Sequence, residues 1–216
     1  MAQERSLNEL RLALAPTIAR SAAFDGWSDE ALIQAAAAHG VDLAVARLAF
    51  PGGAMDMIDA WIASTDTAMA ENFSGGLLAT MKIRDRIRSL ILFRLDAVAG
   101  LEESLRRALA IEAMPQNLAR SLGFGWRSAD AMWRLAGDTA TDYNHYTKRA
   151  TLGAVYAATL AVFVGDDSDG KAETRAFLDR RIDGIMQFEK AKARLLAPRE
   201  HFDMARFLGR LRYPAR

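Results

Sequence analysis

The sequence contains no cysteine among its 216 residues. This absence excludes a disulfide framework, a thiolate zinc site, an iron–sulfur cluster and a cysteine nucleophile. A long apolar run is missing as well, because the longest uncharged stretch, Ala150 to Gly165, has only 16 residues. A helix that spans a membrane needs roughly 20. The amino terminus has no apolar signal core, and Glu4 and Glu9 differ from the acid-poor composition of organelle transit peptides. We therefore expect a cytoplasmic protein without a transmembrane helix.

Excess charge of one sign is also absent. The chain carries 28 Lys and Arg against 27 Asp and Glu, a net charge of +1, and 51% of its residues are hydrophobic. This composition excludes intrinsic disorder and predicts a globular protein with a real core. At this length, one large domain or two small ones are expected.

The apolar residues recur with helical spacing almost everywhere, and no alternating stretch indicates a strand. The first predicted helix has Leu7, Leu10, Leu14 and Ile18 on one face and ends before Gly26. We predict all-α structure, with further helices at about 28–39, 43–49, 54–73, 80–98, 101–112, 116–136, 143–164, 171–195 and 199–212.

The segment from Ser21 to Val41 resembles a helix-turn-helix, with Gly40 at the tight turn. Its charge argues against DNA binding. Between residues 24 and 61 there are six acidic residues and one basic residue, Arg47, which gives a net charge of −5, whereas phosphate contacts need Lys and Arg. We predict that this unit does not bind nucleic acid.

Residues 130–149, DAMWRLAGDTATDYNHYTKR, form a long and unusual motif. The motif resembles the signature of the Coq-nine family of ubiquinone biosynthesis, and the resemblance extends from the turn at Gly26 to about Lys192. It implies a TetR-like helical bundle of about ten helices with a helix-turn-helix-like amino-terminal unit. The expected organisation is one domain over residues 1–198, with subregions 1–53 and 54–198, followed by an amphipathic helix at 199–216.

The same resemblance implies a function. Members of the family are lipid-binding accessory proteins, so we expect a non-enzymatic protein that binds isoprenoid quinone intermediates or phospholipid. The expected partner is the di-iron hydroxylase that acts on demethoxyubiquinone. No cofactor is expected, and a homodimer is possible because TetR-like proteins are often dimers. A bacterial member would lie at the inner membrane, and a mature organellar form on the matrix side.

Two predicted helices are apolar over more than one stripe, which is typical of burial on several sides. Taken alone, this pattern predicts a bundle core. With the resemblance included, we expect these helices to line a lipid cavity, through Ile87, Leu90, Ile91, Leu95, Leu152, Val155, Tyr156 and Leu160.

One predicted helix carries a polar stripe that includes a tryptophan, formed by Arg127, Asp130, Trp133 and Arg134. A tryptophan among charged side chains is typical of a protein interface, so we predict that this stripe binds the hydroxylase. Arg127 and Arg134 depart from the residue types of better-known family members, which makes the expected surface more basic. The alternative is that Trp133 anchors neighbouring helices in the core.

The carboxyl end is basic and amphipathic. Residues 199–216 contain five arginines against Glu200 and Asp203. We predict that this segment binds an anionic membrane surface through Phe202, Arg206, Phe207, Leu208, Arg210 and Leu211. A terminal helix docked on its own domain is the alternative.

The sequence has no catalytic or metal-binding constellation. A di-iron bundle needs Glu-x-x-His on two helices, and the nearest pattern here is a single Asp142-x-x-His145. We interpret Asp138, Asp142 and His145 as caps and polar partners at a helix start. The acidic loop at 166–170 does not fit the ligand spacing of a calcium loop. The alternative function, from another class, is a TetR-type transcriptional regulator with an effector pocket.

Overall fold

The structure is a computed structural model that describes residues 6–139, 141 and 143–196. In this part of the chain every regular element is a helix, as predicted. The elements are α1 (Leu7–Asp25), α2 (Asp29–Ala38), α3 (Leu43–Ala49), α4 (Ala54–Asn72), α5 (Ile83–Asp96), α6 (Glu102–Glu112), η1 (Pro115–Asn117), α7 (Leu118–Leu135), α8 (Tyr143–Phe163), η2 (Asp169–Lys171) and α9 (Ala172–Leu196). The predicted helix at 199–212 and the predicted boundary at residue 198 lie outside the described residues.

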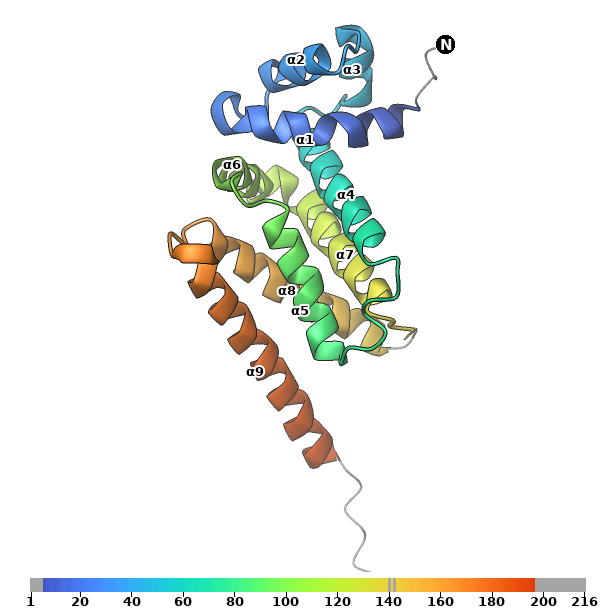
Figure 1. The fold of residues 1–216 in the computed structure, drawn as a ribbon, viewed down its shortest axis with the longest axis vertical. Coiled ribbons are helices and arrows are strands. Elements are labelled where there is room, and N and C mark those ends of the chain that lie inside the picture. Colours follow the sequence, from blue (N-terminus) through green and yellow to red (C-terminus); the bar gives the residue numbers. More distant parts are fainter. Residues whose placement is uncertain (1–5, 140, 142, 197–216) are drawn as a thin grey trace, which may run out of the picture. The chain divides into compact units, whose positions relative to one another are not determined.

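The amino-terminal unit comprises α1, α2 and α3 (Figure 1). α1 begins with a capping box between Ser6 and Glu9 and ends at Gly26, whose φ of 71° suits a residue without a Cβ. The Trp27 indole then donates a hydrogen bond to the Ser104 carbonyl at 3.0 Å. This bond ties the unit to α6, and α1 also contacts α4.

The helix-turn-helix-like part of this unit forms as predicted. Gly40, with φ 62°, makes the turn after α2, and Asp42 caps α3. Arg47 on α3 is paired with Asp29 on α2, and its Nε lies 3.0 Å from a carboxylate oxygen. The one basic residue of α3 is therefore already neutralised.

Helices α4 to α8 form a bundle in which α7 contacts α4, α5, α6 and α8 (Figure 1). The chain divides into two compact units, residues 1–179 and 180–216, and α9 belongs to both. Among the described helices, none combines the length and hydrophobicity needed to cross a bilayer.

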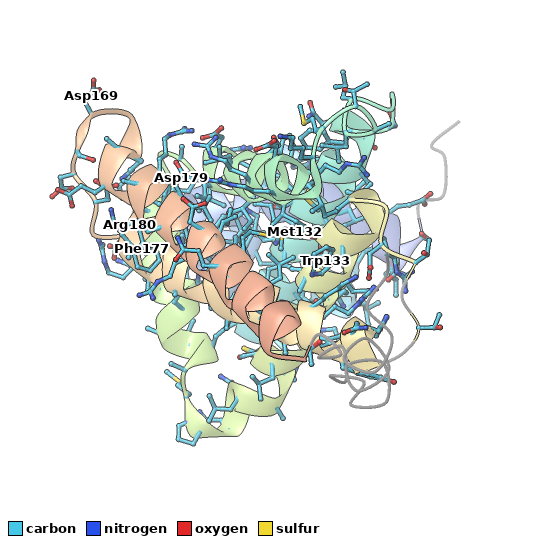
Figure 2. The ribbon with its side chains drawn as sticks, turned by 90° about the horizontal axis from the view of Figure 1, so that it is seen from below. Met132, Trp133, Asp169, Phe177, Asp179 and Arg180 are labelled. Atoms are coloured by element: carbon cyan, nitrogen blue, oxygen red, sulfur yellow. The ribbon has the colours of Figure 1, made fainter. Side chains whose placement is uncertain are left out.

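The turn before α9 is closed by Asp166. Its carboxylate accepts hydrogen bonds from the backbone N–H groups of Ser168 and Thr174 at 2.9 and 2.7 Å, and from both hydroxyls. The Ser168 and Thr174 hydrogen bonds hold the pKa of Asp166 below its usual range. Asp169 lies at the outer tip of this turn (Figure 2). The acidic loop is thus a capping structure, in agreement with its poor match to a calcium loop.

A second carboxylate, Asp56, links the start of α4 to α7. It accepts from the Gly52 N–H at 2.6 Å and from Arg120 Nη2 at 2.7 Å. Burial raises the pKa of Asp56, but Arg120 and the Gly52 N–H more than offset this, so its pKa lies below the usual value.

Replacement of Gly52 tests this link. A Cβ at Gly52 would lie 2.7 Å from the Asp56 carboxylate, so Gly52→Ala must displace the carboxylate and weaken both hydrogen bonds. We expect a loss of about 1–3 kcal/mol in the free energy of unfolding, measured by urea denaturation. Gly75→Ala is the matched control, because nothing lies within 4 Å of a Cβ there. Equal stability of the two variants would contradict the assignment.

Candidate functional site

An apolar cavity of about 580 Å³ lies within the bundle, between α4, α5, α6, α7 and α8. Volumes of roughly 300–1,000 Å³ are typical of pockets for small molecules. Most of the lining side chains are apolar. They come from α4, α6, α7, α8 and the turn after α5, and include Ile58, Trp61, Ile62, Val98, Leu105, Leu109, Phe124 and Leu160.

Small residues leave room for this cavity. Gly125 on α7 and Ala154 on α8 line it where larger side chains would fill the space. Gly153 also lines it, at a place where α8 packs closely on α7, because a Cβ there would lie 3.7 Å from the Gly125 carbonyl oxygen. The cavity opens at the surface, because Leu122 and Trp126 line it and are 75% and 38% exposed.

Of the eight residues predicted to line a lipid cavity, the structure places two at the cavity and six elsewhere in the core. Tyr156 and Leu160 line it. The other six are buried in the core and are not part of its lining, namely Ile87, Leu90, Ile91, Leu95, Leu152 and Val155. α5 and α8 are buried on several sides, and these six residues face neighbouring helices rather than the cavity.

Polar side chains in the lining include Thr65, Arg94, Glu112, Ser121, Ser128 and Arg149. Arg94 on α5 is 2% exposed and is ion-paired with Asp66 of α4. Its Nη2 donates to the Ser128 hydroxyl at 3.0 Å, and its guanidinium lies 4.9 Å from the centre of the Tyr156 ring. This cluster joins four helices at the cavity wall.

A second buried arginine, Arg149, joins α7 to α8. Its Nε lies 2.5 Å from Asp130, and its Nη1 lies 3.1 Å from Asp138, whose side chain is 4% exposed. Asp138 also pairs with Lys148 at 2.7 Å. Asp138 is thus a buried ion-pair partner and not only a polar group near a helix start.

The other polar residues of the motif give no sign of a metal site. The His145 ring lies beside the Tyr146 ring, with centroids 5.1 Å apart, and Asp142 lies outside the described residues. In the part of the chain that the structure describes, His, Asp and Glu side chains form no group able to hold a metal ion.

Two residues of the predicted partner stripe are ion-paired with other helices, one with α4 and the other with α8. Arg127 pairs with Asp59 of α4, whereas Asp130 faces Arg149 of α8. Trp133 is half-buried, and its indole donates to the Lys148 carbonyl at 3.0 Å. Arg134 remains 74% exposed. Figure 2 shows Met132 and Trp133 as neighbours on α7. Trp133 therefore packs on α8 with one side and leaves only part of its ring accessible.

Glu112, at the end of α6, places a carboxyl group in the apolar lining. Burial raises the pKa of Glu112 to about 7. Sequence reasoning missed Glu112, Arg94 and Ser128, although an arginine within the apolar stretch Leu90–Leu95 is a visible signal.

Residues 118–189, which include α7 and α8, match the family model described as COQ9. The mitochondrial ubiquinone biosynthesis protein COQ9 of Rattus norvegicus is 30% identical over 168 residues, which cover 74% of this chain and 54% of the rat protein. The Homo sapiens protein of the same name is also 30% identical, over 74% of this chain and 52% of its own. The Schizosaccharomyces pombe protein is 29% identical, over 73% and 62%. The chain thus spans about half the length of the mammalian relatives that it matches.

A solved structure with a similar fold is the TetR transcriptional regulator from Nitrosomonas europaea ATCC 19718. The two share a TM-score of 0.64 and 25% sequence identity over 81% of this chain and 96% of the regulator. This likeness confirms the predicted TetR-like fold.

The raised pKa of Glu112 predicts a pH-dependent stability. Because the folded protein holds this proton more tightly than the unfolded chain, the stabilising effect is full below pH 4.5 and is lost as pH rises through about 7. Glu112→Gln should therefore stabilise the protein more at pH 8 than at pH 5, by about 2 kcal/mol. Urea unfolding at both pH values measures this difference. Glu71→Gln, at an exposed position, should show none, and an equal effect of Glu112→Gln at both pH values would refute the burial of this carboxyl.

Proposed function

Because the chain belongs to the COQ9 family, we propose that it acts in ubiquinone biosynthesis as a non-enzymatic lipid-binding protein. In this proposal it binds isoprenoid quinone intermediates and presents them to the demethoxyubiquinone hydroxylase at a membrane surface. The curated relatives are named as ubiquinone biosynthesis proteins. That name gives the pathway, and the finer statement about ligand and partner rests on this chain's own features.

The observation that carries the proposal is the apolar cavity. Its volume of about 580 Å³ and its largely apolar wall suit a hydrophobic ligand with few polar atoms. Its opening beside Leu122 and Trp126 would let a long chain emerge. An isoprenoid quinone has this chemistry, and the acyl chain of a phospholipid shares part of it.

Presentation requires a surface for the hydroxylase and one for the membrane. For the first we propose Arg134 and the accessible part of Trp133, together with Asp130, which orients Arg134 through their ion pair, and with Arg127, which lies on the same helix and pairs with Asp59 of α4. For the second we propose the basic segment 199–216, which lies outside the described residues. The relatives are named as mitochondrial, and we expect this chain to act at the cytoplasmic face of a bacterial inner membrane or at the matrix face of the mitochondrial one.

The runner-up is a transcriptional regulator, which the likeness to a TetR regulator favours. Two features of the amino-terminal unit oppose it. The segment from residue 24 to 61, which contains α2, α3 and the start of α4, has a net charge of −5, and Arg47 is paired with Asp29. Leu48, 68% exposed on α3, offers no hydrogen bond to a base. Duplex binding that weakens steeply with salt would favour the regulator.

Filling the cavity should remove the bound lipid. Gly125 lines the cavity, and nothing lies within 4 Å of a Cβ there, so Gly125→Leu places a side chain in the open space and also favours the helix. We expect at least a several-fold loss of isoprenoid lipid, measured by organic extraction of the purified protein and mass spectrometry. Gly123→Leu on the same helix is the control, because Gly123 is exposed and does not line the cavity. Equal lipid in both variants would place the ligand elsewhere.

The partner surface is tested at Arg134. Arg134 is exposed, and Asp130 keeps its buried partner Arg149 when Arg134 is changed, so Arg134→Glu should leave the thermal midpoint nearly unchanged. If this surface docks the hydroxylase, reversal of its charge should weaken binding of the purified enzyme about tenfold or more. Arg20→Glu, at an exposed position on α1, is the matched control. Unchanged affinity in Arg134→Glu would show that the hydroxylase binds another surface.

A further inference from the structure

One hydrogen-bond donor in the cavity wall has no acceptor. Arg94 Nε is buried, and within the described residues no atom accepts its hydrogen. Arg94 is 2% exposed and lines the cavity together with Ser128 and Tyr156. Buried donors are almost always satisfied in folded proteins, so this atom indicates an acceptor supplied from outside the chain.

The geometry of the guanidinium shows where that acceptor would lie. The single hydrogen of Nε and one hydrogen of Nη2 project in the same direction from one edge of the planar guanidinium group. In Arg88 this edge holds both oxygens of Asp179, at 2.5 and 3.2 Å. In Arg47 it holds the carboxylate of Asp29.

On Arg94 the Nε end of this edge has no acceptor within the described residues. Ser128 Oγ accepts from Nη2 at 3.0 Å, while Asp66 is bound at Nη1 on the other side. Because Ser128 Oγ accepts this bond, its own hydrogen is available to a further acceptor. This guanidinium and its Ser128 partner therefore offer two donors at the cavity wall, Arg94 Nε and the Ser128 hydroxyl.

We propose that this edge is the head-group subsite of the cavity, where Arg94 Nε and the Ser128 hydroxyl donate to a neutral oxygen of the ligand, such as a quinone carbonyl or a phenol oxygen. The inference rests on the proposed lipid-binding function and adds the residues that select the head group and orient the ligand.

The charges around the cavity favour a neutral head over an anionic one. Asp66 already balances Arg94, and Asp130 and Asp138 already balance Arg149. Glu112 adds a carboxyl group to the same wall, which repels an anion when it is ionised. A carboxylate or phosphate head would thus gain little attraction and lose its hydration.

The position of the subsite also orients the ligand. Arg94 and Ser128 are both 2% exposed, whereas the rim residues Leu122 and Trp126 are 75% and 38% exposed. A head bound at Arg94 lies at the buried end, and the tail runs toward the opening. The reactive ring is then withheld from solvent, and it must leave this subsite before any partner can act on it.

The test compares three probes with alkyl tails of nine or ten carbons, using the full chain and equilibrium dialysis. The probes are 2-decyl-1,4-benzoquinone, decylbenzene and decanoate. We expect the quinone to bind about tenfold more tightly than decylbenzene, which corresponds to about 1.4 kcal/mol, and more tightly than decanoate. Arg94→Lys keeps the charge beside Asp66 but removes the planar edge. It should abolish the preference for the quinone and leave the affinity for decylbenzene unchanged.

Ser128→Ala provides a second variant if Arg94→Lys does not fold, and it should reduce the same preference. The matched control is Arg88→Lys, which changes the same kind of edge away from the cavity. Equal affinities for quinone and decylbenzene in the unmodified protein would mean that water satisfies Nε, and would overturn the inference alone. If decanoate binds most tightly of the three probes, the proposal that the subsite selects a neutral head group is wrong. No binding of any probe would overturn the proposed function as well.

Discussion

The structure depends on the burial of two arginines on either side of α7. Arg94 and Arg149 are each 2% exposed, and a buried guanidinium is tolerated only with carboxylates and acceptors in good geometry. The first is held between Asp66 of α4 and Ser128 of α7, and the second between Asp130 of α7 and Asp138 after it. A shift of α7 along its axis would break the Arg94–Ser128 hydrogen bond and the Arg149–Asp130 ion pair, so the arginines fix the register of α7 against α5 and α8.

This polar framework has a consequence for the space between the helices. Apolar bundles normally close around small residues, because a void forfeits dispersion contacts. Here Arg149 links α8 to α7 through Asp130, and Arg94 links α5 to α4 and α7 through Asp66 and Ser128, so buried polar contacts help to set the spacing of the helices around the cavity. The buried charges therefore help to determine the space that the cavity occupies.

Periodicity was sufficient to predict the helices but not the cavity. Each described helix lies within a few residues of its predicted range, since apolar spacing and glycines such as Gly26 and Gly40 mark both faces and ends. Apolar spacing reports burial, and Leu90 and Ile91 are indeed fully buried. It does not report which buried face borders a void, because the void is made by residues that have almost no side chain. Asp138 shows a similar limit, since its partners Lys148 and Arg149 are defined only once the turn after α7 is formed.

The same fold serves a transcriptional regulator in the Nitrosomonas europaea structure, and the difference between the two functions must lie in particular side chains. DNA recognition through a helix-turn-helix requires basic residues that are free to meet phosphates. In this chain the one arginine of α3 is paired with Asp29, and Val45 and Leu48 occupy exposed positions of that helix. The polar groups of the bundle line the cavity instead, at Arg94, Ser128 and Glu112. In the proposed function, recognition takes place in the interior of the bundle and not on the surface of the amino-terminal unit, and the apolar and polar parts of the cavity wall suit an apolar ligand with one polar end.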